Sequence, residues 1–518
     1  MTAAALALSA AACSQHGSGP TDQLVLAETL DLGAYNPLLG YGELGVSPVY
    51  EGLLAPQAPD DTRLPDLVPS LAAAKPQQIA PDAWRVPLRA GVKYSDGSAF
   101  DSADVVATYR AAFDPVVAAS ISTAGSPISS VDADGPEAVV VHTTIPVDPS
   151  PYLLLGIVPS ESVEQKPAAD WKLNKEPIGT GPYRLDSLSP DQAVFVARTD
   201  YRGGEPALRR VVYVHVPDDN ARAQRVVAGE TDGASLPPKL ATSLRKDGVD
   251  VVAVHTSDWR GVTLPRGNAF TADLAARRAM NAGVDRSAIV TDVLGGFGSP
   301  ASTPVSPVYG AAFDPAAQFS FDSSAARRIL DDAGWLPGPD GVRRKGRDRA
   351  AFTLLYDAAD TLRRDLTVAF AAAMKPLGVS VTPKGSSWDD IETRLGSDAV
   401  LLGGGDTPYS IASQVDASLH TREAGSSPYD NPGNFTAPGL DALLDGARKT
   451  PAGPGRDAVY RQIQNVYRES PASVYLVFLH HTYVSRSAGW THAAPILEPH
   501  SHGVTWGPWW NLPSWRRA

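Results

Sequence analysis

Apolar residues alternate with polar ones in one short run of the chain, and the spacing then becomes helical. In residues 84–89, Trp84, Val86 and Leu88 alternate with arginine and proline positions, which predicts a strand with one buried face. Residues 95–97, Ser-Asp-Gly, predict a turn after it, because Asp and Gly favour chain reversal.

A helix is predicted after this turn. Asp101 has the position of an N-cap, and Asp104 stands where the second residue of a capping box reaches back to the cap. Pro115 is expected to end the helix. The residues that the spacing places on its buried face are Val105, Tyr109 and Phe113.

Helical and strand-like segments also alternate in the second half of the chain. Residues 274–295 predict two helices, the second capped by Asp285 and closed by Gly295, and Asp322 is expected to cap a third. Apolar spacing predicts two longer helices, with buried positions at 362, 366, 370 and 374 and at 459, 463, 466 and 467. The strand-like runs between them are 352–356, 379–381 and 474–479. This alternation predicts mixed α/β lobes.

The composition narrows the classes of function. Of the 518 residues, 43% are hydrophobic and 20% are charged, so the chain can bury a substantial core. The formal net charge is -12 and the pI is near 5.3. We expect no nucleic-acid partner, because phosphate binding depends on clustered Lys and Arg.

The single cysteine follows an apolar leader. Residues 2–12 are almost all small or apolar, Cys13 comes next, and a polar run begins at Ser14. This order is typical of a signal peptide with a lipobox, in which the thiol of Cys13 is lipidated. The alternative is a free cysteine in a disordered leader. Residues 1–21 are interpreted as leader and tether, and no run after residue 22 is apolar enough to span a membrane.

A glycine motif lies at residues 177–183, Pro-Ile-Gly-Thr-Gly-Pro-Tyr. Gly179 and Gly181 are expected to permit backbone angles that other residues avoid, and Pro182 to fix the entry to a strand. Neither a Lys nor a helix start follows, so the motif is not a phosphate-binding loop.

Several motifs occur in an order that resembles one family. Besides residues 84–115, 177–183 and 274–295, they are 51–54 with 64–70, 200–204 and 228–232. On these motifs the chain resembles the family 5 extracellular solute-binding proteins, the peptide, nickel and haem receptors of ABC importers. The resemblance implies an α/β, two-lobed periplasmic-binding-protein type II (Venus-flytrap) architecture with an extra domain. It also implies a structural role for residues 177–183, at a crossover between the lobes.

The resemblance also implies a division of the chain into domains. Lobe I is expected to collect residues 22–45, 172–262 and 482–518. The extra domain is expected at 46–171, and lobe II at 263–481.

One ligand contact follows from the same resemblance. In the peptide-binding branch, an Asp at the end of a lobe II strand holds the α-ammonium group of the ligand. Here the segment is residues 401–409, and Asp406 has the matching position. An enclosed ammonium loses its water and needs a carboxylate partner. The alternative is that Asp406 caps a turn before Pro408. Gly403, Gly404 and Gly405 stand where relatives carry a Trp-containing run.

The other candidate ligand contacts are aromatic or amide residues of the presumed cleft loops, together with Tyr409 of the Asp406 segment. They are Tyr35, Asn36, Tyr41, Trp388 and Tyr483. We expect an Arg or His of lobe II to hold the ligand carboxylate. No catalytic residue, cofactor or metal ligand is predicted.

Histidines and tryptophans gather near the C-terminus. His500 and His502 could present two rings on one turn to nickel, zinc or haem iron. No Cys or carboxylate accompanies them at a typical spacing, so we prefer the interpretation that aromatic residues anchor the terminus. The residues concerned are His480, His481, His492, His500, His502, Trp490, Trp506, Trp509, Trp510 and Trp515.

The sequence therefore predicts a monomeric substrate-binding lipoprotein of an ABC importer, which captures oligopeptides in an interlobe cleft and delivers them to the permease without catalysis. It is expected on the extracytoplasmic face of the cell envelope, anchored through Cys13. The alternatives are a haem or metal receptor of the same family, a non-transporting regulatory lipoprotein, and a secreted hydrolase. The hydrolase lacks support, because no G-x-S-x-G or H-E-x-x-H motif is present.

Overall fold

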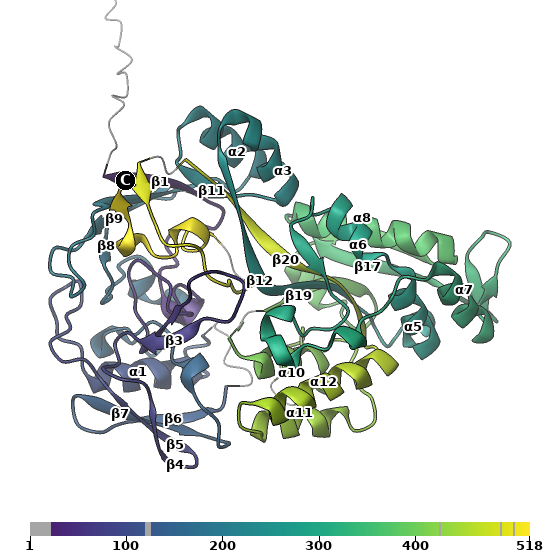
Figure 1. Ribbon diagram of the computed structural model, residues 1–518, viewed down its shortest axis with the longest axis horizontal. Coiled ribbons are helices and arrows are strands. Elements are labelled where there is room, and N and C mark those ends of the chain that lie inside the picture. Colours follow the sequence, from purple (N-terminus) through teal and green to yellow (C-terminus); the bar gives the residue numbers. More distant parts are fainter. Residues whose placement is uncertain are drawn as a thin grey trace, which may run out of the picture.

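Two bodies lie side by side, and two long strands run between them (Figure 1). The computed structural model describes residues 22–119, 126–405, 407, 409–423, 426–486, 489–500 and 503–518. Cys13, Asp406 and His502, which the sequence singled out, lie outside the described residues.

One sheet of 11 strands extends through both bodies. Its order is β18-β17-β19-β12-β20-β11-β1-β10-β9-β8, and β13 pairs with β20 at the side. Its strands are β1 (Gln23–Glu28), β8 (Tyr183–Leu188), β9 (Gln192–Ala197), β10 (Arg210–His215), β11 (Gly233–Ser235), β12 (Asp250–Thr263), β13 (Gly298–Pro300), β17 (Ala351–Asp357), β18 (Ser380–Ser386), β19 (Ala399–Gly404) and β20 (Ser473–Ser485).

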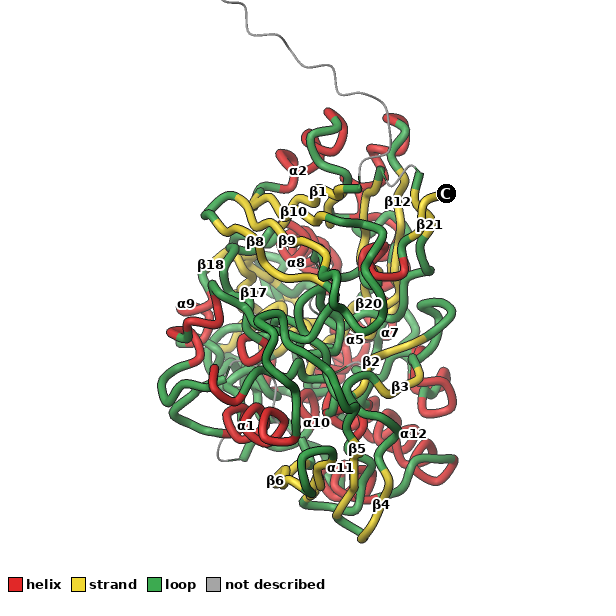
Figure 2. The backbone as a smooth tube through the Cα atoms, turned by 90° about the vertical axis from the view of Figure 1, so that its left-hand side faces the viewer, coloured by secondary structure: helices red, strands yellow, loops and turns green. Residues whose placement is uncertain are grey.

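A separate antiparallel sheet, of order β4-β5-β7-β6, lies at the end of the molecule opposite β1 and β10 (Figure 2). It consists of β4 (Gln77–Ala80), β5 (Ala83–Pro87), β6 (Ile128–Ala133) and β7 (Ala138–Thr143), with α1 (Ser102–Phe113) packed on it. This sheet belongs to the region expected as the extra domain. Its buried side chains join those of β1, β9 and β10 in one continuous core.

The local prediction for α1 is confirmed, except at its last turn. The Asp101 carboxylate accepts from the Ala103 N–H, and the Asp101 N–H donates to Asp104, so the capping box is present. Val105 and Tyr109 are buried, but Phe113 is 39% exposed. Each step of four residues advances 40° beyond a full turn, so the buried face has moved to Ala112 at this level.

Helices flank the large sheet in both bodies. The capping residues predicted for two of them are confirmed: Asp285 begins α6 and Asp322 begins α7. The helices after α1 are α2 (Asp219–Ala228), α3 (Pro238–Ser243), α4 (Ala269–Ala272), α5 (Leu274–Gly283), α6 (Arg286–Asp292), α7 (Ser323–Asp332), α8 (Thr361–Met374), α9 (Trp388–Glu392), α10 (Ile411–Leu419), α11 (Leu440–Lys449) and α12 (Pro454–Glu469). The remaining strands form three small sheets: β2 (Leu54–Gln57) with β3 (Asp66–Pro69), β14 (Leu336–Pro337) with β15 (Arg343–Lys345) and β16 (Asp348–Arg349), and β21 (Trp490–Thr491) with β22 (Arg516–Arg517).

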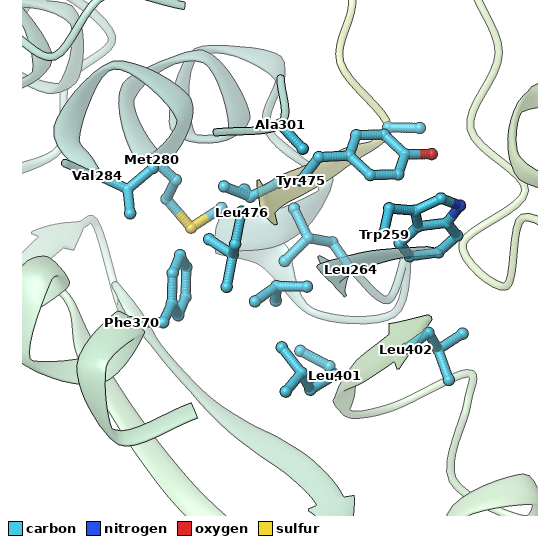
Figure 3. Close-up of a cluster of buried hydrophobic side chains, with 14 of the residues drawn as sticks. Trp259, Leu264, Met280, Val284, Ala301, Phe370, Leu401, Leu402, Tyr475 and Leu476 are labelled. Carbon is cyan, nitrogen blue, oxygen red and sulfur yellow. The ribbon is translucent and has the colours of Figure 1, made fainter. Parts of the chain in front are cut away.

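The second body has its own core. In Figure 3, Met280 of α5, Phe370 of α8 and Leu476 of β20 point toward one another, and all three are fully buried. Trp259 of β12 and Leu402 of β19 lie at the edge of the same cluster (Figure 3). The core therefore ends where β12 and β19 approach the first body.

The strands β12 and β20 connect the two bodies. They pair antiparallel from Asp250 to His255 in the first body and from Trp259 to Thr263 in the second. Between these stretches, three residues of β12 stand opposite one residue of β20, which makes a bulge. The Thr256 hydroxyl supports the bulge, because it donates to the Leu479 carbonyl and accepts from the Asp258 N–H.

A cluster of buried charged groups occupies this bulge. The two ring nitrogens of His481 lie 3.2 Å from an Asp258 oxygen and 2.8 Å from a Glu498 oxygen. Both partners are acceptors, so the protonated imidazolium satisfies the site. Asp258 also pairs with Arg260, and His500 Nδ1 lies 2.8 Å from an Asp258 carboxylate oxygen. We call these five residues the hinge cluster.

The charges of the hinge cluster support one another. Burial acts to raise the pKa of Asp258, but Arg260 and the two histidines outweigh burial and hold that pKa well below its ordinary value. Burial acts to lower the pKa of His481, and the hydrogen bonds to Asp258 and Glu498 outweigh it and raise that pKa. Removing His481 would cost Glu498 its cationic partner and Asp258 one of its three, and both carboxylates are fully buried.

The glycines of the motif at 177–183 are required for a different reason from the one expected. Neither Gly179 nor Gly181 has a positive φ, so the expectation of special backbone angles is wrong. Instead, the backbones approach closely: the Gly181 N–H donates to the Val49 carbonyl at 2.8 Å, and a Cβ on Gly181 would lie 2.6 Å from that oxygen. The motif therefore fastens residues 48–49 to the first body and does not lie where β12 and β20 cross between the bodies.

Replacing Gly181 with Ala is expected to destabilise the protein by about 1–3 kcal/mol, because the new methyl group overpacks the Val49 carbonyl. Urea unfolding measures the change. The control is Gly446→Ala in α11. A Cβ at position 446 would meet no neighbouring group within 4 Å, and Ala should stabilise the helix there by about 0.5–1 kcal/mol. Equal effects at the two positions would contradict the close approach.

Replacing His481 with Gln is expected to cost roughly 3–5 kcal/mol, because the buried Glu498 loses its cationic partner and Asp258 loses one of its three. A raised histidine pKa stabilises the fold fully below the unfolded value of about 6.5, and this stabilisation is lost as the pH rises through the folded value. Urea unfolding should therefore show a larger difference between wild type and variant at pH 6 than at pH 9. His142→Gln, a change at a partly exposed histidine outside the hinge cluster, is the control. A pH-independent difference would remove the imidazolium from the hinge cluster.

Candidate functional site

A cavity of about 740 Å³ opens beside the hinge cluster, and we call it the main cavity. Most of its wall comes from the second body: β19 with Gly405 after it, α9, α10 and the loop around Tyr429. Trp259 of β12 and His500 close it on the hinge side, and Ala119 reaches it from the region of the extra domain. Parts of the chain far apart in sequence therefore enclose one space.

Arg363 is the buried cation of the main cavity. It lies in the first turn of α8, where its Nη1 donates to the Leu401 carbonyl at 2.9 Å and its Nε to Asp360 at 3.0 Å. The guanidinium also stacks over the Trp388 ring at 5.2 Å. Burial lowers its pKa to about 10, so it stays charged at neutral pH. Among the described residues, Nη2 has no hydrogen-bond partner, which leaves one donor group for a ligand.

The three glycines at 403–405 are explained by Trp259 and its neighbours. A Cβ on Gly404 would overlap the Trp259 indole nitrogen, and a Cβ on Gly403 would lie 2.5 Å from Arg260 Nη1. Gly405 has a φ of +113° and lies against the Asp258 backbone. The indole of Trp259 thus fills the space next to the β19 glycines, and β12 contributes this aromatic side chain to the wall of the main cavity. Sequence reasoning missed Trp259 because its contact with Gly404 joins distant parts of the chain.

A second cavity of about 440 Å³ lies in the first body, and we call it the acidic cavity. Tyr35 and Tyr41, both predicted as ligand contacts, line it. Their rings meet edge to face with centroids 5.0 Å apart. Trp388 lines the main cavity, and its ring meets that of Tyr429 in the same way at 5.7 Å.

The other predicted contacts lie elsewhere. Asn36 is fully buried, and its side chain accepts from the Leu38 N–H as a helix cap. Tyr483 is also fully buried, where its hydroxyl donates to Glu498 at 2.6 Å and its ring packs on Trp509. The Tyr409 hydroxyl donates to the Leu497 carbonyl at 2.8 Å. These three residues line neither of the two cavities.

No group of three or more His, Cys, Asp or Glu among the described residues is placed to hold a metal ion. His500 takes part in the hinge cluster and lines the main cavity. His492 stacks on Trp515 with centroids 5.0 Å apart, which fits the aromatic anchoring of the C-terminal segment. Within the part of the chain that the structure describes, no helix has both the length and the apolar character needed to cross a membrane.

Known proteins match this chain over most of its length. Protein XP55 of Streptomyces lividans is 36% identical over 502 residues, which cover 93% of this chain and 89% of that protein. The oligopeptide-binding protein AppA of Bacillus subtilis is 26% identical over 340 residues, 62% of each chain. The nickel-binding periplasmic protein of Escherichia coli is 26% identical over 402 residues, 73% of this chain and 74% of that one.

Solved structures show the same fold. NikZ from Campylobacter jejuni, in complex with Ni(L-His), superposes with a TM-score of 0.83 at 22% identity, over 96% of this chain and 100% of that one. AppA from Bacillus subtilis, in complex with a nonapeptide, superposes with a TM-score of 0.77 at 20% identity, over 96% of this chain and 99% of that one. The predicted two-lobed periplasmic-binding-protein fold is thus confirmed.

The family described as "Bacterial extracellular solute-binding proteins, family 5 Middle" matches residues 66–426. This match covers most of the chain. The resemblance drawn from the motifs is therefore confirmed, and the chain belongs to the family 5 bacterial extracellular solute-binding proteins.

Proposed function

We propose that the protein captures oligopeptides between its lobes and delivers them unchanged to the permease of an ABC importer. The observation that carries this proposal is the main cavity, which combines aromatic walls with a buried cation whose Nη2 is unpaired among the described residues. Aromatic faces accept varied side chains, and a guanidinium binds a carboxylate well. A relative, AppA, is described as an oligopeptide-binding protein, and its solved structure contains a nonapeptide.

The two ends of a peptide have separate partners in this proposal. Arg363 holds the ligand carboxylate through Nη2, and Asp406 holds the α-ammonium group. Asp406 lies outside the described residues, but Gly405 and Thr407 on either side of it line the main cavity. A free peptide carries both charges, so this pair of partners recognises a feature that all free peptides share.

The proposed domains are lobe I (22–45, 172–262 and 482–518), the extra domain (46–171) and lobe II (263–481). The change of pairing in β12 after His255 supports a hinge at the boundary between the lobes. Contacts of Tyr152 support closure, since its hydroxyl lies 3.1 Å from Ser410 and 2.6 Å from Ser413, and Ser413 lines the main cavity. Closure would give the permease a shape to recognise. We further propose that lipidated Cys13 anchors the protein, as a monomer, at the extracytoplasmic face of the membrane.

Asp406→Asn is expected to weaken binding of the peptide Ala-Ala-Ala by about 10- to 100-fold, because the ammonium loses its charged partner. Binding of N-acetyl-Ala-Ala-Ala should change little. Isothermal titration calorimetry on both peptides provides the comparison. Asp430→Asn, at another carboxylate of the main cavity, is the matched control. If Asp430→Asn gives the selective loss instead, Asp406 is not the ammonium partner.

Arg363→Met is expected to weaken binding of Ala-Ala-Ala by about 10- to 100-fold and to leave the C-terminal amide of the same peptide nearly unaffected. Met keeps much of the length and the contact with Trp388, and thermal unfolding checks the fold. The control is Arg364→Met, which alters the exposed neighbour in the same helix. Equal losses for acid and amide would show that Arg363 supports the wall without binding the carboxylate.

A further inference from the structure

The acidic cavity has a charge opposite to that of Arg363. Three acidic residues, Glu28, Asp31 and Glu43, line it, and no Lys, Arg or His is among the described residues of its wall. Aromatic side chains provide much of the remaining surface: Tyr35, Tyr41, Tyr213 and Trp506. A concave wall that combines carboxylates with aromatic rings attracts cations by Coulomb and cation–π interactions.

Two tyrosines of this wall carry buried hydroxyl groups without partners. Tyr35 is 5% exposed and Tyr213 is 1% exposed, and neither hydroxyl has a hydrogen-bond partner among the described residues. A buried hydroxyl without a partner costs free energy. A hydroxyl group of this kind beside a cavity could be satisfied by a polar ligand.

Glu28 lies at the end of β1, where the chain enters the cavity wall. Its carboxylate accepts from the Thr29 N–H at 2.6 Å and the Leu30 N–H at 3.2 Å. Burial nevertheless raises the pKa of Glu28, and the charge of Glu28 adds to burial in raising the pKa of Tyr35. Asp31 lies 3.5 Å from His215, and Arg222 offsets the burial of Glu28 only in part. Glu28 has no ion-pair partner among the described residues, so a ligand that brings positive charge would stabilise its carboxylate.

The two cavities lie on either side of the segment that contains Pro499 and His500. Pro499 lines the acidic cavity, whereas His500 lines the main cavity and contacts Asp258. Two successive residues of the chain therefore face different cavities. A ligand held in the main cavity has the acidic cavity as a near neighbour in the first body.

We propose that the acidic cavity binds a primary ammonium or guanidinium group through Glu28, with the hydroxyls of Tyr35 and Tyr213 as additional acceptors. The group is either the basic side chain of a peptide held in the main cavity, which rests on the proposed function, or a separate alkylamine. A metal ion is the less favoured occupant, because the described residues offer no group of three ligands.

Calorimetric titrations with three probes test this site. The tripeptides are Ala-Lys-Ala and Ala-norleucine-Ala, which differ in one ammonium group, and the free amine is 1,5-diaminopentane. Wild-type protein should bind Ala-Lys-Ala about 10- to 100-fold more tightly than the norleucine peptide, or else bind the diamine directly. Glu28→Gln should remove whichever preference is found. Asp191→Asn, an exposed change between β8 and β9, should retain it.

Tyr213→Phe keeps the site testable if Glu28→Gln does not fold. Because the hydroxyl that it removes has no partner, thermal stability should not fall, yet the selected probe should bind several-fold more weakly. Failure of both tripeptides with retained diamine binding would reject the peptide function and keep the cation site. Equal affinity for the two tripeptides without diamine binding would overturn the cation site, as would displacement of the probes by Mg²⁺ alone.

Discussion

The structure depends on the pairing of β12 with β20, because these strands join the two halves of the one large sheet. A continuous ladder of hydrogen bonds between β12 and β20 would hold the two lobes in a fixed relative position, but the bulge at residues 256–258 interrupts the ladder. Asp258 lies in this interruption, and its charge is neutralised by Arg260 and His481. The relative position of the lobes therefore depends on a short irregular stretch whose buried charges are paired in the present arrangement.

The hinge cluster and the main cavity share the same few residues. In β12, Asp258 belongs to the hinge cluster, whereas Trp259 lines the main cavity. In the C-terminal segment, Glu498 contacts His481, and His500 both contacts Asp258 and lines the main cavity. A ligand that moves His500 or Trp259 therefore acts directly on the irregular part of β12. Coupling between binding and closure then needs no long pathway through either core.

Local patterns in the sequence identified the elements that local forces determine. The capping box of α1 and the caps of α6 and α7 could be predicted, because a carboxylate and N–H groups a few residues away form each of them. The family motifs also gave the two-lobed fold. The error at Phe113 arose from extending an i+4 spacing past the point where the helix face had rotated away.

Contacts between distant residues could not be read from the sequence. Position 404 requires glycine because the Trp259 indole lies against it, and position 181 requires glycine because the Val49 carbonyl does. The carboxylate of Asp258 is paired in part with the ring of His500, 242 residues later in the chain. Only the folded chain brings such groups together. Tyr483, which the sequence suggested as a ligand contact, illustrates the same point: its side chain is fully buried and its hydroxyl donates to Glu498 of the hinge cluster.

The opposite charges of the two cavities have a consequence for selectivity. The main cavity contains the cation Arg363 together with the carboxylate of Asp430, while the acidic cavity contains Glu28 without a lining base among the described residues. A ligand that spans the distance from Arg363 to Glu28 is favoured when its group at Arg363 is negative and its group at Glu28 is positive. A ligand with the reverse polarity would meet like charges at both ends, and the low-dielectric surroundings would strengthen that repulsion. Charge placement therefore orients the ligand before any side-chain pocket contributes.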